Sequence, residues 1–187
     1  MRTIRRAAVL MAIALICAPH PSVAQDEGKT EAAELAQASQ AALQTLYSSV
    51  ELAKQLGTNA QAILVFPKVT KAGLGIGGQY GEGTLLRKGT AAGYYKTTGA
   101  SFGLQAGGQQ YGYAMFFMNA KALDDFLNAS GFEVGVGPSV VLLDEGKAKT
   151  ATTNTMKDDI YAFVFGQKGL MAGLGIQGNK ITKITPK

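Results

Sequence analysis

Five basic residues lie at the ends of glycine-rich segments, where cationic side chains could bind an anion. They are Lys68, Lys71, Arg87, Lys88 and Lys168. The first two precede the segment from Gly73 to Gly83, the next two follow it, and the last precedes a second such segment. Backbone amides beside glycine and the charged groups of Lys and Arg both favour a phosphate. Lysines at strand ends also protect sheet edges from pairing, so the spacing alone leaves both explanations open.

The glycine spacing also satisfies the G-x-G-x-x-G pattern of dinucleotide-binding proteins. The pattern occurs from Gly73 to Gly78 and again from Gly173 to Gly178. A dinucleotide site needs a strand before these glycines and a helix after them, because the helix N-terminus holds the pyrophosphate. Here the residues on both sides continue as strand and turn patterns. Nucleotide binding is therefore not predicted.

The first 24 residues have the layout of a secretory signal peptide. Three arginines form a basic region, an apolar run follows from 7 to 18, and small residues end at Ala24. The run is too short to span a bilayer. We expect cleavage after Ala24 and export to the periplasm or cell envelope. Lipidation at Cys17 is the less favoured alternative, because Ile16 stands where lipoprotein signals carry a small residue.

Cleavage would change both the charge and the chemistry of the chain. Losing Arg2, Arg5 and Arg6 from 18 basic residues leaves fifteen against 13 acidic ones, a net charge near +2, so nucleic acid is not indicated. His20 and Cys17, the only residues of their types, are also removed. Ser-His-Asp and Cys-His catalysis and histidine-rich metal sites are then excluded. No pattern singles out a Ser-Lys or paired-carboxylate enzyme, and we predict no enzyme, no cofactor and no metal site.

Three helices are predicted. Residues 30–56 repeat apolar side chains at a spacing of three to four, with Thr30 as the N-cap. We expect this helix to pack on the core by its leucine side. Insertion at a membrane surface is the alternative, although Lys54 is the only basic residue on its polar face. A capping-box pattern favours a short helix from Thr58, and Asn119 can cap another that runs to residue 128.

The rest of the chain alternates strand and turn patterns. Dipeptides that end in glycine predict turns at 82–83, 88–89 and 98–99. The expected strands are 63–66, 72–80, 83–88, 92–98, 101–108, 111–118, 132–137, 139–143, 160–165, 170–178 and 181–185, with 148–157 as an exposed strand or a loop. This pattern predicts an α+β fold that is mainly β, with a glycine-rich antiparallel sheet closed or nearly closed into a barrel. The expected parts are a signal peptide (1–24), a helical segment (25–57) and a β-rich domain (58–187).

Within the first glycine segment, glycines alternate with larger apolar residues. A strand of this kind has one bare face and one apolar face, the latter with Leu74, Ile76 and Tyr80. The five residues from Ala72 recur at 172–176. We expect two related strands that pack closely by their bare faces, so that Gly75→Val damages folding before it damages binding.

The segment 63–83, ILVFPKVTKAGLGIGGQYGEG, resembles the opening of the SYLF domain, the lipid-binding module also found in yeast and animal actin-patch proteins. The likeness continues through 101–109 and through 161–178, where KGLMAG at 168–173 is similar to the family's ending. The resemblance covers roughly residues 40–185. It implies binding of phosphorylated lipids, phosphoinositides among them, through a basic surface and an amino-terminal amphipathic segment. The expected export makes actin an unlikely ligand, and no other protein partner is indicated.

These observations lead to one expected function and two alternatives. We expect non-enzymatic binding of anionic, phosphate-bearing lipids at a membrane surface of the bacterial cell envelope, with the five cations as the phosphate site. A periplasmic structural or protein-interaction module without lipid dependence is the alternative. An outer-membrane barrel would also fit the alternating strands, but the predicted helices argue against it.

Overall fold

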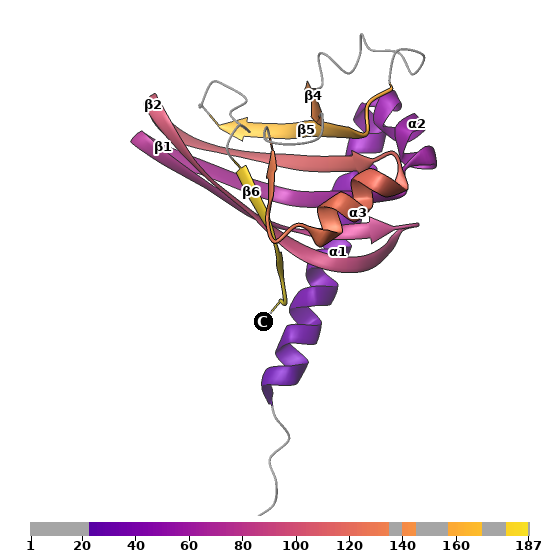
Figure 1. Cartoon of the computed structure of the whole chain (residues 1–187). Helices are drawn as coiled ribbons and strands as arrows, with labels where there is room; N and C mark the ends of the chain where they lie inside the picture. Colours follow the sequence, from indigo (N-terminus) through magenta and orange to yellow (C-terminus); the bar gives the residue numbers. More distant parts are fainter. Residues whose placement is uncertain (1–22, 135–139, 145–156, 170–178, 187) are drawn as a thin grey trace, which may run out of the picture.

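The computed structural model describes residues 23–134, 140–144, 157–169 and 179–186, except for the side chains of 23–29, 75, 101–106, 134 and 144 (Figure 1). Nine elements follow one another in these ranges. They are α1 (Val23–Ser49), α2 (Glu51–Asn59), β1 (Ala62–Arg87), β2 (Thr90–Phe117), α3 (Ala120–Asn128), β3 (Phe132–Val134), β4 (Val140–Asp144), β5 (Ile160–Gly169) and β6 (Asn179–Ile184). The predicted α+β fold, mainly β, is confirmed. The predicted strands at 148–157 and 170–178 lie outside the described residues.

β1 and β2 form one long hairpin that organises the sheet. They pair along their whole length, from Ala62 opposite Phe117 to Arg87 opposite Thr90. The turn between them is Lys88-Gly89, where both residues have positive φ (49° and 79°). The turns predicted at 82–83 and 98–99 are wrong, because these glycines lie inside the long strands. Their missing side chains serve close packing there instead of chain reversal.

The remaining strands extend the sheet from the second edge of β2. β6 pairs with Tyr94 to Thr98, and β5 pairs with Gln109 to Phe117. β3 then joins β6, and β4 joins β5. The sheet curls into a nearly closed shape, as predicted (Figure 1). The described pairs are antiparallel, as predicted, except that β4 runs parallel to β5.

The hairpin bends at its glycine-rich middle, where the register shifts between Leu74 and Ile76. We call residues 62–74 of β1 its first arm and residues 76–87 its second arm. A Cβ atom on Gly83 would lie 2.3 Å from the carbonyl oxygen of Val65, and one on Gly81 would lie 2.8 Å from that of Lys68. The bare face therefore packs closely, as predicted, but its described neighbour is the first arm of the same strand. The repeat at 172–176 lies outside the described residues, and so does the space around Gly75.

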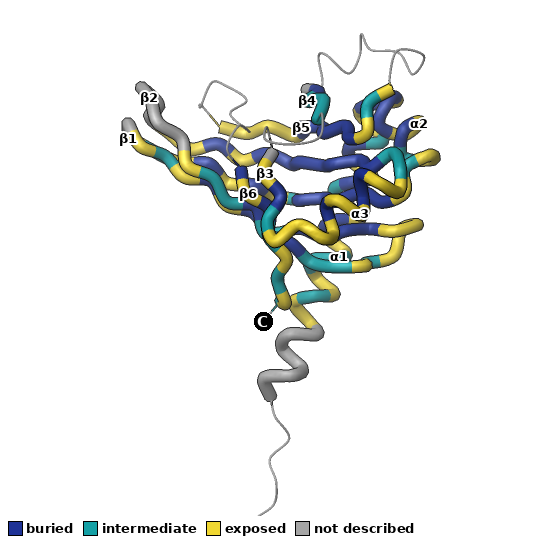
Figure 2. The backbone as a smooth tube through the Cα atoms, viewed as in Figure 1, coloured by how far each residue is buried: buried dark blue, intermediate teal, exposed yellow. Residues whose placement is uncertain are grey.

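Two apolar clusters hold the layers together. The inner cluster fills the space between the arms and includes Leu64, Phe66, Met115, Phe117, Phe126 and Ile181. The outer cluster joins the other face of the first arm to α1 and α2 and includes Leu46, Leu56, Val65, Phe116 and Phe163. Figure 2 shows this burial where the helices cover the sheet. Strict alternation along 62–66 supplies both clusters, because successive side chains point to opposite faces.

The predicted helix at 30–56 is divided in two. α1 begins at Val23, so Thr30 lies inside it, and it ends at Ser49. Val50 has extended backbone angles and only 3% exposure, which places its side chain in the outer cluster and breaks the helix. The predicted packing by the leucine side is confirmed by Leu43 and Leu46, both buried.

Two shorter helix predictions had opposite outcomes. A helix from Thr58 is wrong: α2 ends at Asn59 and the chain enters β1 at Ala62. The helix capped by Asn119 is confirmed, because its side-chain oxygen accepts a hydrogen bond from the Ala122 amide at 2.8 Å. α3 then places Phe126 against the rings of Tyr95, Phe117 and Phe132, with centroids 4.9–5.5 Å away.

Candidate functional site

The five predicted cations occupy three different places. Lys68 on the first arm and Lys168 on β5 are exposed on the outer face of the sheet, the face that α1 and α2 partly cover. Lys71 is 2% exposed and points to the inner face. Arg87 and Lys88 are exposed at the hairpin turn. The turn packs on α1, where the Gln40 amide donates to the carbonyl oxygen of Gly89 at 2.8 Å.

Two of these cations flank one continuous surface. Lys168 is opposite Gln110 on β2, and Gln110 is opposite Thr70 on β1, so the three form a row across three strands. All three side chains are exposed. Lys68 lines a cleft on one side of Thr70, and Lys168 lines a second pocket on the other side. The sequence pattern did not distinguish this pair from the other three cations.

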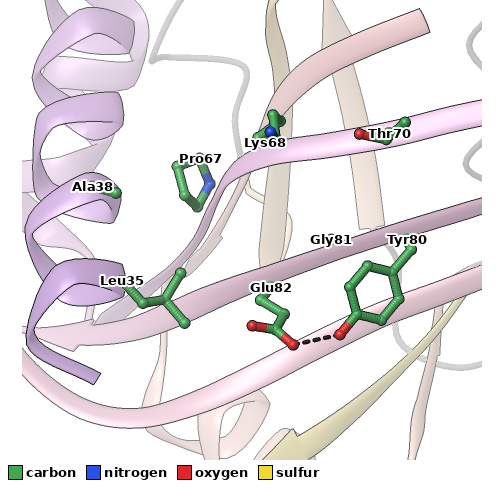
Figure 3. A pocket seen from close by; sticks show the side chains of 8 residues that line it. All are labelled: Leu35, Ala38, Pro67, Lys68, Thr70, Tyr80, Gly81 and Glu82. Atoms are coloured by element: carbon green, nitrogen blue, oxygen red, sulfur yellow. Dashed lines mark hydrogen bonds between the residues drawn. The ribbon is translucent and has the colours of Figure 1, made fainter. Parts of the chain in front are cut away.

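The cleft beside Lys68 lies between the two arms of β1 (Figure 3). Its volume is about 410 Å³, and it is lined by Leu35, Ala38, Pro67, Lys68, Thr70, Tyr80, Gly81 and Glu82. β1 is an edge of the described sheet, since its only described partner is β2. The cleft opens along that edge and is bounded by α1 at one end (Figure 3).

α1 is held at this edge by a buried serine. The Ser39 hydroxyl, which is fully buried, lies 3.2 Å from the carbonyl oxygen of Val65 in the first arm. It also lies 3.1 Å from the Thr84 hydroxyl in the second arm. One helical side chain therefore bridges both arms and fixes their separation at the closed end of the cleft. Leu35, one turn earlier in α1, contributes to the apolar wall.

The cleft has apolar walls and a small polar set. Leu35, Ala38, Pro67 and the half-exposed ring of Tyr80 supply the apolar surface. The Tyr80 hydroxyl donates a short hydrogen bond to the Glu82 carboxylate. This bond, followed by partial burial, raises the pKa of Tyr80 above its usual value. Glu82 and Lys68 therefore give the cleft one acidic and one basic side chain.

The neighbouring pocket is polar. Its volume is about 310 Å³, and it is lined by Thr70, Gly108, Gln109, Gln110, Lys168 and Gly169. The Gln109 amide donates to Oε1 of Gln167 at 3.1 Å, which orders one wall. A Cβ on Gly169 would lie 2.3 Å from the carbonyl oxygen of Gly108, so glycine lets β5 approach β2 closely here. Cleft and pocket together form an amphipathic groove, which we call the Thr70 groove.

A further apolar surface continues from the groove toward the bend of β1. Leu74 is 83% exposed, Ile76 is 68% exposed and Tyr80 is 49% exposed. The sequence placed these residues on the apolar face of a strand but did not show that this face is open. Glycine alternation was the available signal. Whether another element covers this face depends on contacts between residues far apart in the chain.

Other site types have no support in the described part of the chain. Among described residues, no three His, Cys, Asp or Glu side chains gather into a group that could hold a metal ion. No described helix is long and apolar enough to cross a membrane.

Comparison with known proteins supports one assignment. Residues 98–185 match the family model described as Ysc84, the Las17-binding protein actin regulator. No curated protein matches the sequence significantly. The matched span begins within β2 and ends just after β6, so it includes Lys168 and excludes Lys68. Residues 98–185 therefore belong to the Ysc84 family, the SYLF-domain family that the sequence resembles.

Proposed function

We propose that this protein binds anionic phospholipid without catalysis, at a membrane surface of the bacterial cell envelope. The Thr70 groove is the observation on which the proposal rests. An apolar cleft and a polar pocket share Thr70, with Lys68 at one end and Lys168 at the other. This arrangement suits a molecule with an apolar chain and a phosphate head group. The family, whose description names binding, supports a binding role.

The two lysines account for the preference for anionic lipid. A Lys near an anionic membrane contributes about 1 kcal/mol of attraction, so Lys68 and Lys168 together contribute about 2 kcal/mol, and added salt screens it. Leu74 and Ile76 add an apolar contribution, because full burial of such a side chain is worth about 1.5–3 kcal/mol. The sum corresponds to peripheral, reversible binding.

Vesicle flotation of the mature chain tests this proposal. We expect flotation with phosphatidylglycerol vesicles, little with neutral phosphatidylcholine vesicles, and a loss as salt is raised. The double variant Lys68→Ser/Lys168→Ser should float several-fold less. Lys54→Ser/Lys183→Ser removes the same charge from exposed positions outside the groove and serves as the matched control. Equal flotation with both lipids, or equal losses in both double variants, would refute the groove as the lipid site.

The open edge of β1 favours one alternative. An edge strand can pair with an extended peptide from another protein, and the matched family is described by its binding of a protein. A protein-interaction module would show no lipid dependence in the flotation assay. It would instead bind a protein partner through the β1 edge. Thr70→Pro on that edge should release the partner, because proline adds bulk and removes a backbone donor.

A further inference from the structure

Lys71 is a buried cation on the inner face of the first arm. Its side chain is 2% exposed, and no described residue gives it a hydrogen bond or an ion pair. Transfer of an unpaired ammonium group into a protein interior is costly, so buried charges are normally paired. A negatively charged ligand that reached this side chain would therefore be favoured.

Among the described residues, no carboxylate forms an ion pair with Lys71. Glu82, the only acidic residue of β1, lines the outer cleft and accepts a hydrogen bond from Tyr80. The glycine-rich segments 101–106 and 170–178 contain no acidic residue in their sequence.

Polar side chains occupy the facing arm. Gln79 on β1 is opposite Gly99 on β2, and Asn179 follows directly after the last β2–β6 pair, Thr98 opposite Lys180. Gln79 and Asn179 are 8% and 4% exposed. A Cβ on Gly99 would lie 2.3 Å from Oδ1 of Asn179 and 3.2 Å from Nε2 of Gln79. Both side-chain amides therefore lie close to the same glycine, on the inner face of the sheet.

A tyrosine links these residues to the arm that carries Lys71. The Tyr111 hydroxyl lies 3.2 Å from Oε1 of Gln79 and can donate to it. Tyr111 is opposite Val69, and Gln109 is opposite Lys71, so Lys71 and Tyr111 are diagonal neighbours on the inner face. Burial raises the pKa of Tyr111 to about 12, and the hydroxyl stays a donor at neutral pH.

Two donors of this cluster lack a partner. Nε2 of Gln79 and the hydroxyl of Thr97 are buried and have no hydrogen-bond partner in the described structure. Thr97 is 1% exposed and faces inward two residues before Gly99 on β2. Unpaired buried donors cost about 1–3 kcal/mol each, and a ligand with several acceptor oxygens would satisfy them. A negative charge would also pair with Lys71.

We propose that Lys71, Gln79 and Thr97 bind a phosphate-type oxyanion inside the sheet, with Tyr111 orienting the Gln79 amide. This interior site is separate from the Thr70 groove and does not depend on the lipid proposal. Free phosphate and a lipid head group share the required chemistry.

Thermal unfolding of the mature chain in phosphate and in chloride at equal ionic strength tests the interior site. A ligand at a hundred times its Kd should raise the Tm of wild type by roughly 5–10 °C. Lys71→Met should abolish the phosphate-dependent rise, whereas Lys54→Met, at an exposed position of α2, should keep it. If Lys71→Met fails to fold, Gln79→Leu replaces it in the same comparison. No rise in wild type, or an equal rise in the interior variant, would overturn the proposal.

Vesicles of phosphatidic acid distinguish the two sources of phosphate. If the interior variant loses both the phosphate-dependent rise and flotation, the ligand is a lipid head group. If it loses the rise and floats like wild type, the ligand is free phosphate. Failure of wild type to float would refute the lipid proposal alone, since the thermal measurement contains no lipid.

Discussion

Gly83→Ala tests the close contact between the two arms of β1. The added Cβ would lie 2.3 Å from the carbonyl oxygen of Val65 and 2.7 Å from Cδ1 of Phe66. An ordinary contact needs about 1 Å more, and the neighbours cannot move freely because Val65 and Phe66 are fully buried. Overpacking of this kind costs about 3 kcal/mol, from which the lower entropy of the unfolded Ala chain subtracts about 0.5–1 kcal/mol.

The expected net loss is therefore about 2 kcal/mol of the free energy of unfolding. For a chain of this size, it corresponds to a Tm roughly 4–8 °C lower. Urea unfolding of the mature chain, followed by far-UV circular dichroism, measures the free energy directly. The urea midpoint should fall while the slope m stays constant, because one methyl group barely changes the surface that unfolding exposes.

Gly78→Ala is the matched control on the same strand. Its Cβ would meet no atom closer than 3.9 Å, and the position is exposed, so we expect a change within about 0.5 kcal/mol. If Gly83→Ala unfolded at the same urea concentration as Gly78→Ala, the close packing of the arms would be refuted. Gly75→Val remains a prediction, because the space around Gly75 lies outside the described side chains.

Three further predictions concern the surface, a helix cap and a buried tyrosine. Leu74→Ser/Ile76→Ser should reduce flotation on phosphatidylglycerol vesicles at high salt, where the apolar contribution to binding dominates. Leu127→Ser, which changes another exposed leucine, should leave flotation unchanged. Equal losses in the two variants would contradict an apolar contact at the bend. Asn119→Ala should lower the free energy of unfolding by about 1 kcal/mol in urea, because the α3 cap is lost, and an unchanged midpoint would argue against the cap. The raised pKa of Tyr111, about 12, predicts that its stabilising contribution is complete below pH 10 and is lost as the pH rises from 10 to 12, because the unfolded tyrosine ionises first. Urea midpoints of wild type and Tyr111→Phe across this range measure the effect, and parallel curves would contradict it.

The local sequence pattern was sufficient to predict several features of the fold. The continuous apolar run 63–66 predicted a buried strand, and both apolar clusters use it because successive side chains in a strand point to opposite faces. Asn119 predicted a helix start, since its short side chain satisfies a free amide of the first turn. The residues in 101–109 and 161–178 also predicted the family, and the match at 98–185 confirmed it.

The location of the cations was decided only by the tertiary structure. Inner-facing residues of the first arm are Leu64 and Phe66 and then Val69 and Lys71, because the register shifts between Phe66 and Val69. A regular strand would have placed Lys68 inside and Lys71 outside. The shift coincides with Pro67, which has no backbone donor and is tolerated on an edge strand or at a bulge.

The same limit applies to the groove and the interior cluster. Composition and spacing determined that the chain is rich in glycine, nearly neutral after the expected cleavage, and built mainly of strands. They did not determine that β1 is an edge, that its arms face one another, or that Gln79 and Asn179 meet over Gly99. Each of these depends on pairing between residues far apart in the chain, and a strand's own pattern carries no information about its partner. The sequence alone therefore identified the candidate cations and the glycine-rich segments, and the tertiary structure determined which of them share a site.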